Sequence, residues 1–180
     1  MLYSTKYASS LGAITLASDG KNIVGLWIEG QKYFAASVKE GFAENHNLPV
    51  FTATKRWLDA YFSGRKTTSS TLPLAPVNGS DFRKIVWDIL CEIPYGQCTT
   101  YGDIAKKVAI QMNKKSMSSQ AVGGAVGHNP ISIIIPCHRV VGSNGSLTGY
   151  AGGIDKKITL LELEGVTTSH LFTPVRGTSL

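Results

Sequence analysis

Hydrophobic and polar positions change their period along the chain, from strand-like to helix-like. Apolar runs at residues 13–16 and 23–28 flank a polar stretch that contains Gly20, which predicts a β-hairpin whose turn uses the positive φ that glycine allows. Residues 33–44 follow no clean period and predict no element. Over residues 51–62, aromatic and aliphatic side chains recur on one face, which predicts the first helix.

A second region begins after residues 66–80, which are rich in Ser, Thr, Pro and Gly and form the one clear boundary in the sequence. Apolar residues then recur at helical spacing in several segments, with Ser80 as the first N-cap and Gly165 as the last C-cap. The segments predicted to be helical are residues 81–93, 101–108, 120–126 and 154–164.

The helices predicted at 101–108 and 120–126 are short and are joined by a polar, basic turn, which is the outline of a helix-turn-helix. Gly123 and Gly124 lie inside the second helix, where each glycine costs about 1 kcal/mol relative to alanine. That cost indicates that something approaches the helix backbone closely, and a nucleic-acid groove is one candidate. Residues 140–148 surround a turn rich in Gly and Ser and predict a β-wing.

Composition narrows the class of protein. The chain has 180 residues, of which 43% are hydrophobic and 17% charged, so it has room for one large domain or two small ones. It contains no apolar run long enough to span a membrane, and its start lacks the apolar stretch of a signal peptide. Three cysteines without a CxxC spacing argue against a disulfide framework and favour a reducing compartment. The four histidines match no zinc-site spacing, so no metal is expected.

The net charge of +6 is unevenly distributed. No acidic residue occurs between Asp103 and Asp155. The cationic residues of that span are Lys106, Lys107, Lys114, Lys115 and Arg139. Solvated surface lysines would explain so sparse a set of charges, but the complete absence of acids favours a surface that faces phosphates.

The candidate chemistry lies in residues 133–141, which read IIIPCHRVV. Cys137 follows a proline and precedes His138 and Arg139, and an imidazole and a positive charge lower the pKa of a neighbouring thiol. If the chain is extended here, Cys137 and His138 point to opposite faces, so a water or a local turn must connect them. The alternatives are a buried cysteine at the end of a core strand and, more weakly, a thiol hydrolase, for which no oxyanion-hole signature is present.

Motifs beyond residue 80 recur in the order and at the spacing of a known family. They are Phe82-x-x-x-Val86-Trp87, Tyr101, Ala121-Val122-Gly123-Gly124, Asn129-Pro130, Ile135-Pro136-Cys137-His138-Arg139-Val140, Gly149-Tyr150-Ala151-Gly152-Gly153, Lys157 and Leu160-Leu161-Glu162-Leu163-Glu164-Gly165. On these motifs, residues 82–165 resemble the O6-alkylguanine-DNA alkyltransferases, and residues 1–80 resemble the N-terminal lobe of that family more loosely.

The resemblance implies an α+β fold. A small α/β lobe, ribonuclease-H-like in that family, would occupy residues 1–80. A winged helix-turn-helix domain with the active site would occupy residues 81–165, and residues 166–180 would form an irregular tail. The implied function is direct-reversal DNA repair by a cofactor-free, monomeric protein of the cytoplasm, or of the nucleus in a eukaryote. Such a protein moves the alkyl group of O6-alkylguanine, and of O4-alkylthymine, onto its own cysteine once and does not turn over.

The resemblance also implies roles for individual residues. Cys137 would accept the alkyl group, His138 would deprotonate it through a water, and Glu164 would orient the imidazole. Asn129 would hold the turn before the active site, and Tyr101 would donate a hydrogen bond to the extruded base. The residues expected to line the base pocket are Val140, Tyr150, Ala151 and Lys157, and those expected to contact DNA are Gln120, Ala121, Gly123, Gly124, Arg139, Lys114 and Lys115.

The family binds double-stranded DNA through the minor groove and flips the target nucleotide out of the duplex. An arginine commonly precedes the Ala-Val-Gly-Gly motif in the family, and this chain has Gln120 there. We expect Gln120 to enter the space left by the flipped base without adding charge. A non-catalytic damage sensor of the same fold is the main alternative, but members that only bind lack the acceptor cysteine, which is present here as Cys137.

Overall fold

The computed structural model describes residues 1–36, 38, 41–77 and 79–174. The chain divides into two compact units, one formed by Met1–Asn78 with Pro130–Ile134 and the other by Gly79–Asn129 with Ile135–Leu180. The sequence analysis predicted two contiguous regions, whereas in the structure the five residues Pro130–Ile134 join the first unit. These residues run beside strand β3 (Ile23–Ile28), where Leu26 donates its N–H to Pro130 O at 2.8 Å and accepts from Ser132 N at 3.0 Å.

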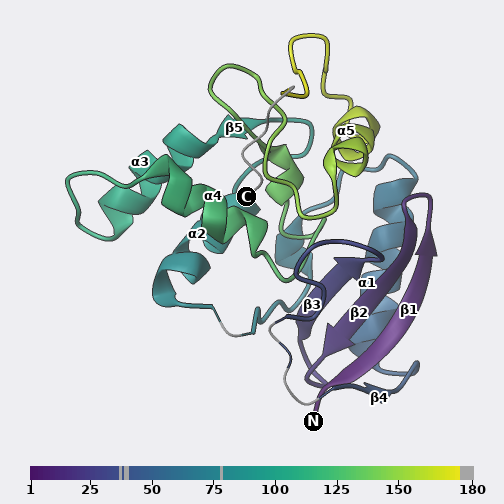
Figure 1. The fold of residues 1–180 in the computed structure, drawn as a ribbon. Coiled ribbons are helices and arrows are strands. Elements are labelled where there is room, and N and C mark those ends of the chain that lie inside the picture. Colours follow the sequence, from purple (N-terminus) through teal and green to yellow (C-terminus); the bar gives the residue numbers. More distant parts are fainter. Residues whose placement is uncertain (37, 39–40, 78, 175–180) are drawn as a thin grey trace. The chain divides into compact units, whose positions relative to one another are not determined.

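The first unit is built on a four-stranded sheet in the order β3-β2-β1-β4 (Figure 1). Strand β2 (Gly12–Ser18) pairs antiparallel with β3, which confirms the predicted hairpin. Strand β1 (Tyr3–Ser9) pairs antiparallel with β2, and the two-residue β4 (Ala43–Glu44) pairs parallel with β1. Strand β1 was not predicted, because its residues are mostly polar and half-buried or exposed, and only Thr5 among them is buried.

Helix α1 (Pro49–Phe62) lies against the sheet, near the predicted range 51–62. It starts with a proline, which is favourable there because the first helical N–H has no partner to lose. Its buried face includes Trp57 and Tyr61, whose rings stack with centroids 5.4 Å apart. A short 3₁₀ turn, η1 (Ser69–Thr71), follows.

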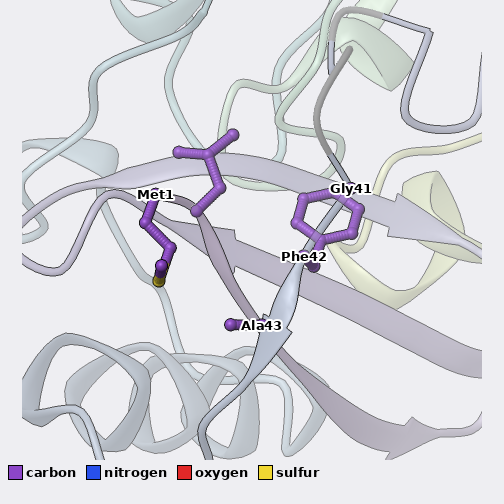
Figure 2. A pocket seen from close by; sticks show the side chains of 5 residues that line it. Met1, Gly41, Phe42 and Ala43 are labelled. Carbon is purple, nitrogen blue, oxygen red and sulfur yellow. The ribbon is translucent and has the colours of Figure 1, made fainter.

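Trp27 fills the other part of this core by folding over a glycine. A Cβ added at Gly25 would come within 2.0 Å of the Trp27 ring, so only glycine leaves space for the indole. The indole also contacts Phe34 and Phe42, with centroids 5.7 and 6.0 Å away. Phe42 also lines a pocket, together with Met1, Leu2, Gly41 and Ala43 (Figure 2).

The second unit is mainly helical. Its elements are α2 (Asp81–Cys91), β5 (Thr99–Thr100), α3 (Tyr101–Gln111), α4 (Ser119–Gly127), the 3₁₀ turn η2 (Cys137–Arg139), β6 (Val140–Val141) and α5 (Ile154–Leu163). The predicted N-cap at Ser80 is confirmed, because its side chain accepts the N–H of Arg83. Thr100 and Ser118 cap the next two helices in the same way, by accepting the N–H groups of Asp103 and Ala121. The molecule is therefore a mixed α+β protein with an N-terminal sheet and a helical C-terminal part (Figure 1).

Helices α2, α3 and α4 pack pairwise and form the predicted helix-turn-helix with its supporting helix. Trp87 of α2 donates its indole N–H to Ala125 O of α4 at 3.0 Å. Helix α3 runs three residues beyond its predicted end and stops where Asn113 takes a positive φ of 51°. Among the described residues, none of the helices is both long and apolar enough to cross a membrane.

The predicted β-wing is replaced by a loop. Strand β6 pairs in parallel with β5 instead of forming a hairpin with the residues that follow it. Ser146 bridges to Phe172, and Leu171 packs against the cluster of Val141, Leu147 and Leu161. The described part of the tail, up to residue 174, therefore forms no helix or strand but packs onto the second unit through residues such as Leu171.

Candidate active site

A tight turn places the candidate nucleophile. Pro136 has φ −82° and ψ 63°, and Cys137 N donates to Ile135 O at 2.8 Å, which together define an inverse γ-turn. Cys137 then begins the 3₁₀ turn η2, so the chain is not extended at this point and the opposite-face argument for Cys137 and His138 does not apply. Proline suits the turn because its ring fixes φ near −65° and it needs no acceptor.

Cys137 is buried, with 4% of its surface exposed. Asn129, at the end of the helix-turn-helix, donates from Nδ2 to Cys137 Sγ at 3.1 Å and to Ile135 O at 2.8 Å. Burial raises the pKa of the Cys137 thiol, while the Asn129 hydrogen bond and the positive charge of Lys157 act in the opposite direction. The thiol is therefore protonated at rest and requires a base before it can attack.

His138 has the properties of that base. Burial lowers the pKa of His138, and Glu164 only partly restores it, so the imidazole is neutral at physiological pH. Its Nε2 lies 2.7 Å from Glu164 Oε1. That contact fixes the ring and places the proton on Nε2, which leaves Nδ1 as the basic nitrogen.

The buried carboxylate of Glu164 binds several groups at once. Besides His138, its carboxylate binds Arg139 at two points, with Nε–Oε2 at 2.8 Å and Nη2–Oε1 at 3.0 Å, and it accepts the N–H of Gly96 at 3.1 Å. Burial would raise the pKa of Glu164, but the hydrogen bonds from His138 and Arg139 outweigh it and bring the pKa to about 2. The carboxylate thus stays charged throughout the physiological range and supports His138.

Arg139 corrects one expectation from the sequence. It is 6% exposed, and besides binding Glu164 it donates from Nη1 to Ile93 O at 2.6 Å and lies over the Tyr95 ring at 5.8 Å. A guanidinium held in this way is turned inward, so its burial argues against the phosphate contact that we expected. The sequence carried no sign of this, because Glu164 lies 25 residues away.

The residues expected around the base meet at one carbonyl. Thr148 O accepts the Tyr101 hydroxyl at 2.9 Å and Lys157 Nζ at 2.8 Å, and Lys157 also donates to Val140 O at 2.6 Å. Lys157 is fully buried, and burial lowers its pKa to about 8. The lysine therefore joins the loop at Thr148 to β6. Val140, expected in the base pocket, lies in β6, and Tyr150 and Ala151 follow Thr148 in the loop.

Tyr150 and Ala151 follow Thr148 in the same loop. The Tyr150 side chain is buried, and its ring stands edge-on to His138 with centroids 6.4 Å apart and planes at 80°. Ala151 is half-buried. Sequence reasoning missed Gly96 and Thr148, because both contribute through the backbone and neither belongs to a motif.

The residues expected to contact DNA lie mostly on the surface of the helix-turn-helix. Gln120 and Ala121 at the start of α4 are exposed, as are Lys114 and Lys115 in the turn before it. Gly124 is half-buried, and a Cβ there would meet nothing within 4 Å. Gly123 is instead buried on the inner face of α4, which argues against direct contact with a ligand.

The acid-free span also carries less unpaired positive charge than its sequence suggests. Lys106 pairs with Asp103 and Lys107 with Glu92, both at 3.0 Å, so acids outside the span neutralise two of its lysines. Within the described part of the chain, no three His, Cys, Asp or Glu side chains lie together as a metal site would require.

Two family models match the chain. Residues 2–76 match the ribonuclease-like domain of 6-O-methylguanine DNA methyltransferase, and residues 81–166 match the DNA-binding domain of the same protein. The chain belongs to the 6-O-methylguanine DNA methyltransferase family. Both lobes of the family are thus represented, including the N-terminal one that the sequence indicated only loosely.

Relatives in this family cover nearly the whole chain. A methylated-DNA–protein-cysteine methyltransferase of Haemophilus influenzae is 41% identical over 92% of this chain and 87% of its own length. One of Methanosarcina acetivorans is 44% identical over 91% of this chain and 99% of its own. The crystal structure of the O6-methylguanine methyltransferase of Mycobacterium tuberculosis superposes with a TM-score of 0.77 at 36% identity, covering 98% of this chain and 97% of that one. A complex of the M. tuberculosis protein with DNA gives the same TM-score at 37% identity, with 94% of each chain covered.

Proposed function

We propose that the protein repairs DNA by direct reversal, moving the alkyl group of O6-alkylguanine onto its own Cys137. The observation that carries this function is a buried thiol held by Asn129 beside a neutral histidine that is fixed on a carboxylate. Relatives that carry the name methylated-DNA–protein-cysteine methyltransferase support the same reaction. O4-alkylthymine, which presents an alkyl group on a comparable exocyclic oxygen, is the expected second substrate.

In the proposed reaction, His138 takes the thiol proton of Cys137 through one water, and Glu164 stabilises the imidazolium that forms. The thiolate then attacks the alkyl carbon, a C–S bond forms and the bond from that carbon to guanine O6 breaks. The thiol proton ends on the guanine, so the net change is an exchange of proton and alkyl group. The thioether is stable, and each molecule reacts once.

The base pocket would be formed by the chain around Thr148. Val140 and Ala151 would contact guanine through their backbone groups, and Tyr150 would form a wall. Tyr101 would donate its hydroxyl to the base, which requires it to leave Thr148 O. Because Lys157 also donates to that carbonyl, Thr148 keeps a partner when Tyr101 moves.

An alkyl group inside a duplex is out of reach of a buried thiol, so the nucleotide must be flipped out. We propose that α4 enters the minor groove and that Gln120, exposed at its start, fills the space left by the base. Lys114 and Lys115 would contact phosphates from the preceding turn. The protein would act as a monomer and in the cytoplasm, where its thiol stays reduced.

The test is mass spectrometry of the intact protein and of its peptides after incubation with a duplex containing one O6-methylguanine. The expected result is a gain of one methylene on the peptide with Cys137, at one equivalent per protein, and none for Cys137→Ser. A duplex that binds without modifying Cys137 would contradict transfer and leave a damage sensor. Modification with repeated turnover would contradict the single-use mechanism.

A further inference from the structure

Ile133 has a backbone conformation that a branched side chain rarely adopts. Its φ is 70°, and Ile134 N donates to Ser132 O at 2.8 Å, so a hydrogen bond closes across a single residue of positive φ. This form of γ-turn is rare and strained. Among the described residues other than glycine that have a positive φ, Ile133 alone is branched at Cβ. Such strain persists only where the surrounding structure imposes it, and it concentrates at functional sites.

Strand β3 and the turn after it hold the chain on the N-terminal side of Ile133. The backbone of Leu26 binds Ser132 N at 3.0 Å. The Ser132 hydroxyl donates to Gln31 Oε1 at 3.2 Å, and the same oxygen accepts the N–H of Ile28, the last residue of β3, at 2.8 Å. Gln31 and Ser132 are both buried. Ser132 is therefore fixed to β3 through its backbone and through its side chain.

The chain after Ile133 has no slack before the nucleophile. The γ-turn at Ile133 ends at Ile134, and the next residue, Ile135, begins the inverse γ-turn around Pro136 that presents Cys137. Ile134 and Ile135 are both buried, so packing restrains them as well. Two tight turns in direct succession contain no extended residue that could absorb a change at the first turn. A rotation of the backbone at Ile133 would therefore be carried to Cys137.

The sulfur of Cys137 depends on accurate placement. Its hydrogen bond from Asn129 Nδ2 is 3.1 Å long, and the same nitrogen donates to Ile135 O at 2.8 Å. Hydrogen bonds weaken steeply when their angle departs from the preferred range. Burial raises the pKa of the Cys137 thiol, and the Asn129 hydrogen bond acts against that effect. A displaced Cys137 would thus lose part of the contact that favours its thiolate.

We infer that Gln31 is a positioning residue for alkyl transfer. By binding the Ser132 hydroxyl, Gln31 imposes the strained turn at Ile133, and that turn sets the sulfur of Cys137 against Asn129. This role rests on the proposed function and extends it to a residue 101 positions before Ser132. The effect runs along the chain, from Ser132 in the first unit to Cys137 in the second, and needs no contact between Gln31 and the reacting atoms.

The test uses Ser132→Ala in the full-length protein, which removes the hydroxyl and leaves Gln31 Oε1 bound to Ile28 N. Amide hydrogen exchange at Ile134 reports on the γ-turn, because that N–H closes it. Iodoacetamide labelling of the Cys137 peptide across pH gives the apparent pKa of the thiol, and single-turnover kinetics on a methylated duplex give the transfer rate.

The expected result for Ser132→Ala is faster exchange at Ile134 and a Cys137 pKa that is higher by about one unit. The thiolate fraction at neutral pH then falls about tenfold, and the transfer rate at neutral pH should fall by the same factor. The rate should recover at alkaline pH, where the thiol ionises without help. A hydrogen bond that only stabilises the fold would change the melting temperature and none of these three properties.

Three further variants complete the test. Gln31→Leu removes the acceptor instead of the donor and should shift all three properties in the same direction, which also provides a test if Ser132→Ala folds poorly. Gln31→Glu keeps an acceptor oxygen for Ser132 and should restore the exchange at Ile134 and the Cys137 pKa toward the parent values. Thr54→Val is the matched control, because it removes a buried hydroxyl of α1 that donates to Val50 O, and it should change none of the three.

Two outcomes would overturn the inference. One is that Ser132→Ala and Gln31→Leu lower the melting temperature but keep the parent exchange at Ile134 and the parent Cys137 pKa. The other is that exchange at Ile134 becomes faster while the Cys137 pKa stays at its parent value, since the turn would then not be coupled to the sulfur. Failure of the parent protein to accept a methyl group from the duplex would instead refute the proposed function, and the exchange and iodoacetamide measurements would still test the positioning role.

Discussion

Arg139 and Glu164 form a two-point ion pair inside the second unit, with Nε–Oε2 at 2.8 Å and Nη2–Oε1 at 3.0 Å. The pair is adjacent to the chemistry, since Arg139 follows His138 in sequence and Glu164 binds both side chains. The imidazole and the guanidinium share one carboxylate, and the charge of Arg139 helps to lower the pKa of His138. The ion pair thus keeps His138 both oriented and neutral, which a base requires.

Removing one partner of this pair should be strongly destabilising. Arg139→Leu leaves the buried Glu164 carboxylate with fewer donors, and the expected loss in the free energy of unfolding is about 3–5 kcal/mol. Arg139→Lys keeps the charge without the planar fork and should lose less. Lys106→Ala breaks an exposed ion pair with Asp103 and should change the free energy of unfolding far less, because solvent screens surface ion pairs. Urea denaturation of the three variants checks the order, and equal losses for Arg139→Leu and Lys106→Ala would contradict it.

Stability should fall in acid in two steps. His138 has a folded pKa below its ordinary 6.5, so the unfolded chain binds the proton more readily and stability declines as pH falls below about 6.5. Glu164 has a folded pKa of about 2 against an ordinary 4.5, so its contribution is complete above 4.5 and is lost as pH falls toward 2.

Thermal unfolding followed from pH 8 to pH 3 measures both steps. Glu164→Gln should be less stable at neutral pH and should show a flatter dependence below pH 4.5, because the amide does not titrate. The step below pH 6.5 reports on His138, and His138→Gln should flatten that part of the curve. An acid limb of the same slope in Glu164→Gln and the parent would contradict the assignment to Glu164.

The elements that the sequence predicted well are those whose signals are local. The helix-turn-helix follows from side-chain caps at Thr100 and Ser118 and from apolar spacing, and each of these acts within four residues. The hairpin β2–β3 follows from two apolar runs around Gly20, which takes φ 102°. Motif resemblance to a family then supplied the identity of the candidate site residues, because no local pattern pairs residues such as His138 and Glu164.

The errors concern contacts that join distant residues. Arg139 looked like a phosphate contact because its partner is 25 positions away, and the strand that pairs with β6 is β5, some 40 residues earlier, and not the residues that follow β6. Strand β1 was missed because its polar residues are stabilised by pairing with β2 and not by an apolar face of their own. Gly123 is buried and Gly124 is only half-buried, a difference that two adjacent glycines in a sequence cannot reveal.

Gln120 should matter for duplex DNA and not for a substrate that needs no flipping. Gln120→Ala should slow methyl transfer from a duplex about tenfold, because the space left by the extruded nucleotide loses its occupant. The rate with the same lesion in a single strand should change little. Gln111→Ala, which alters an exposed glutamine at the end of α3, serves as the matched control. A Gln120→Ala protein that repairs duplex at the parent rate would show that this residue does not intercalate.

The lysines of the acid-free span should divide into two classes in the salt dependence of DNA binding. Lys114 and Lys115 are exposed in the turn between α3 and α4, whereas Lys106 and Lys107 are bound to Asp103 and Glu92. Each phosphate contact adds about 0.9 to the slope of log K against log salt, so alanine at both 114 and 115 should lower that slope by roughly two.

The double alanine variant at 106 and 107 removes the same formal charge and is the matched control. Its lysines are already neutralised by acids, so it should change the slope by less than about half as much, and binding isotherms from 50 to 200 mM salt separate the two cases. Equal slopes for the two double variants would mean that total charge, and not the position of the turn, governs DNA binding. A difference in the expected direction would instead place the α3–α4 turn against the phosphate backbone, on the same side of the second unit as the start of α4.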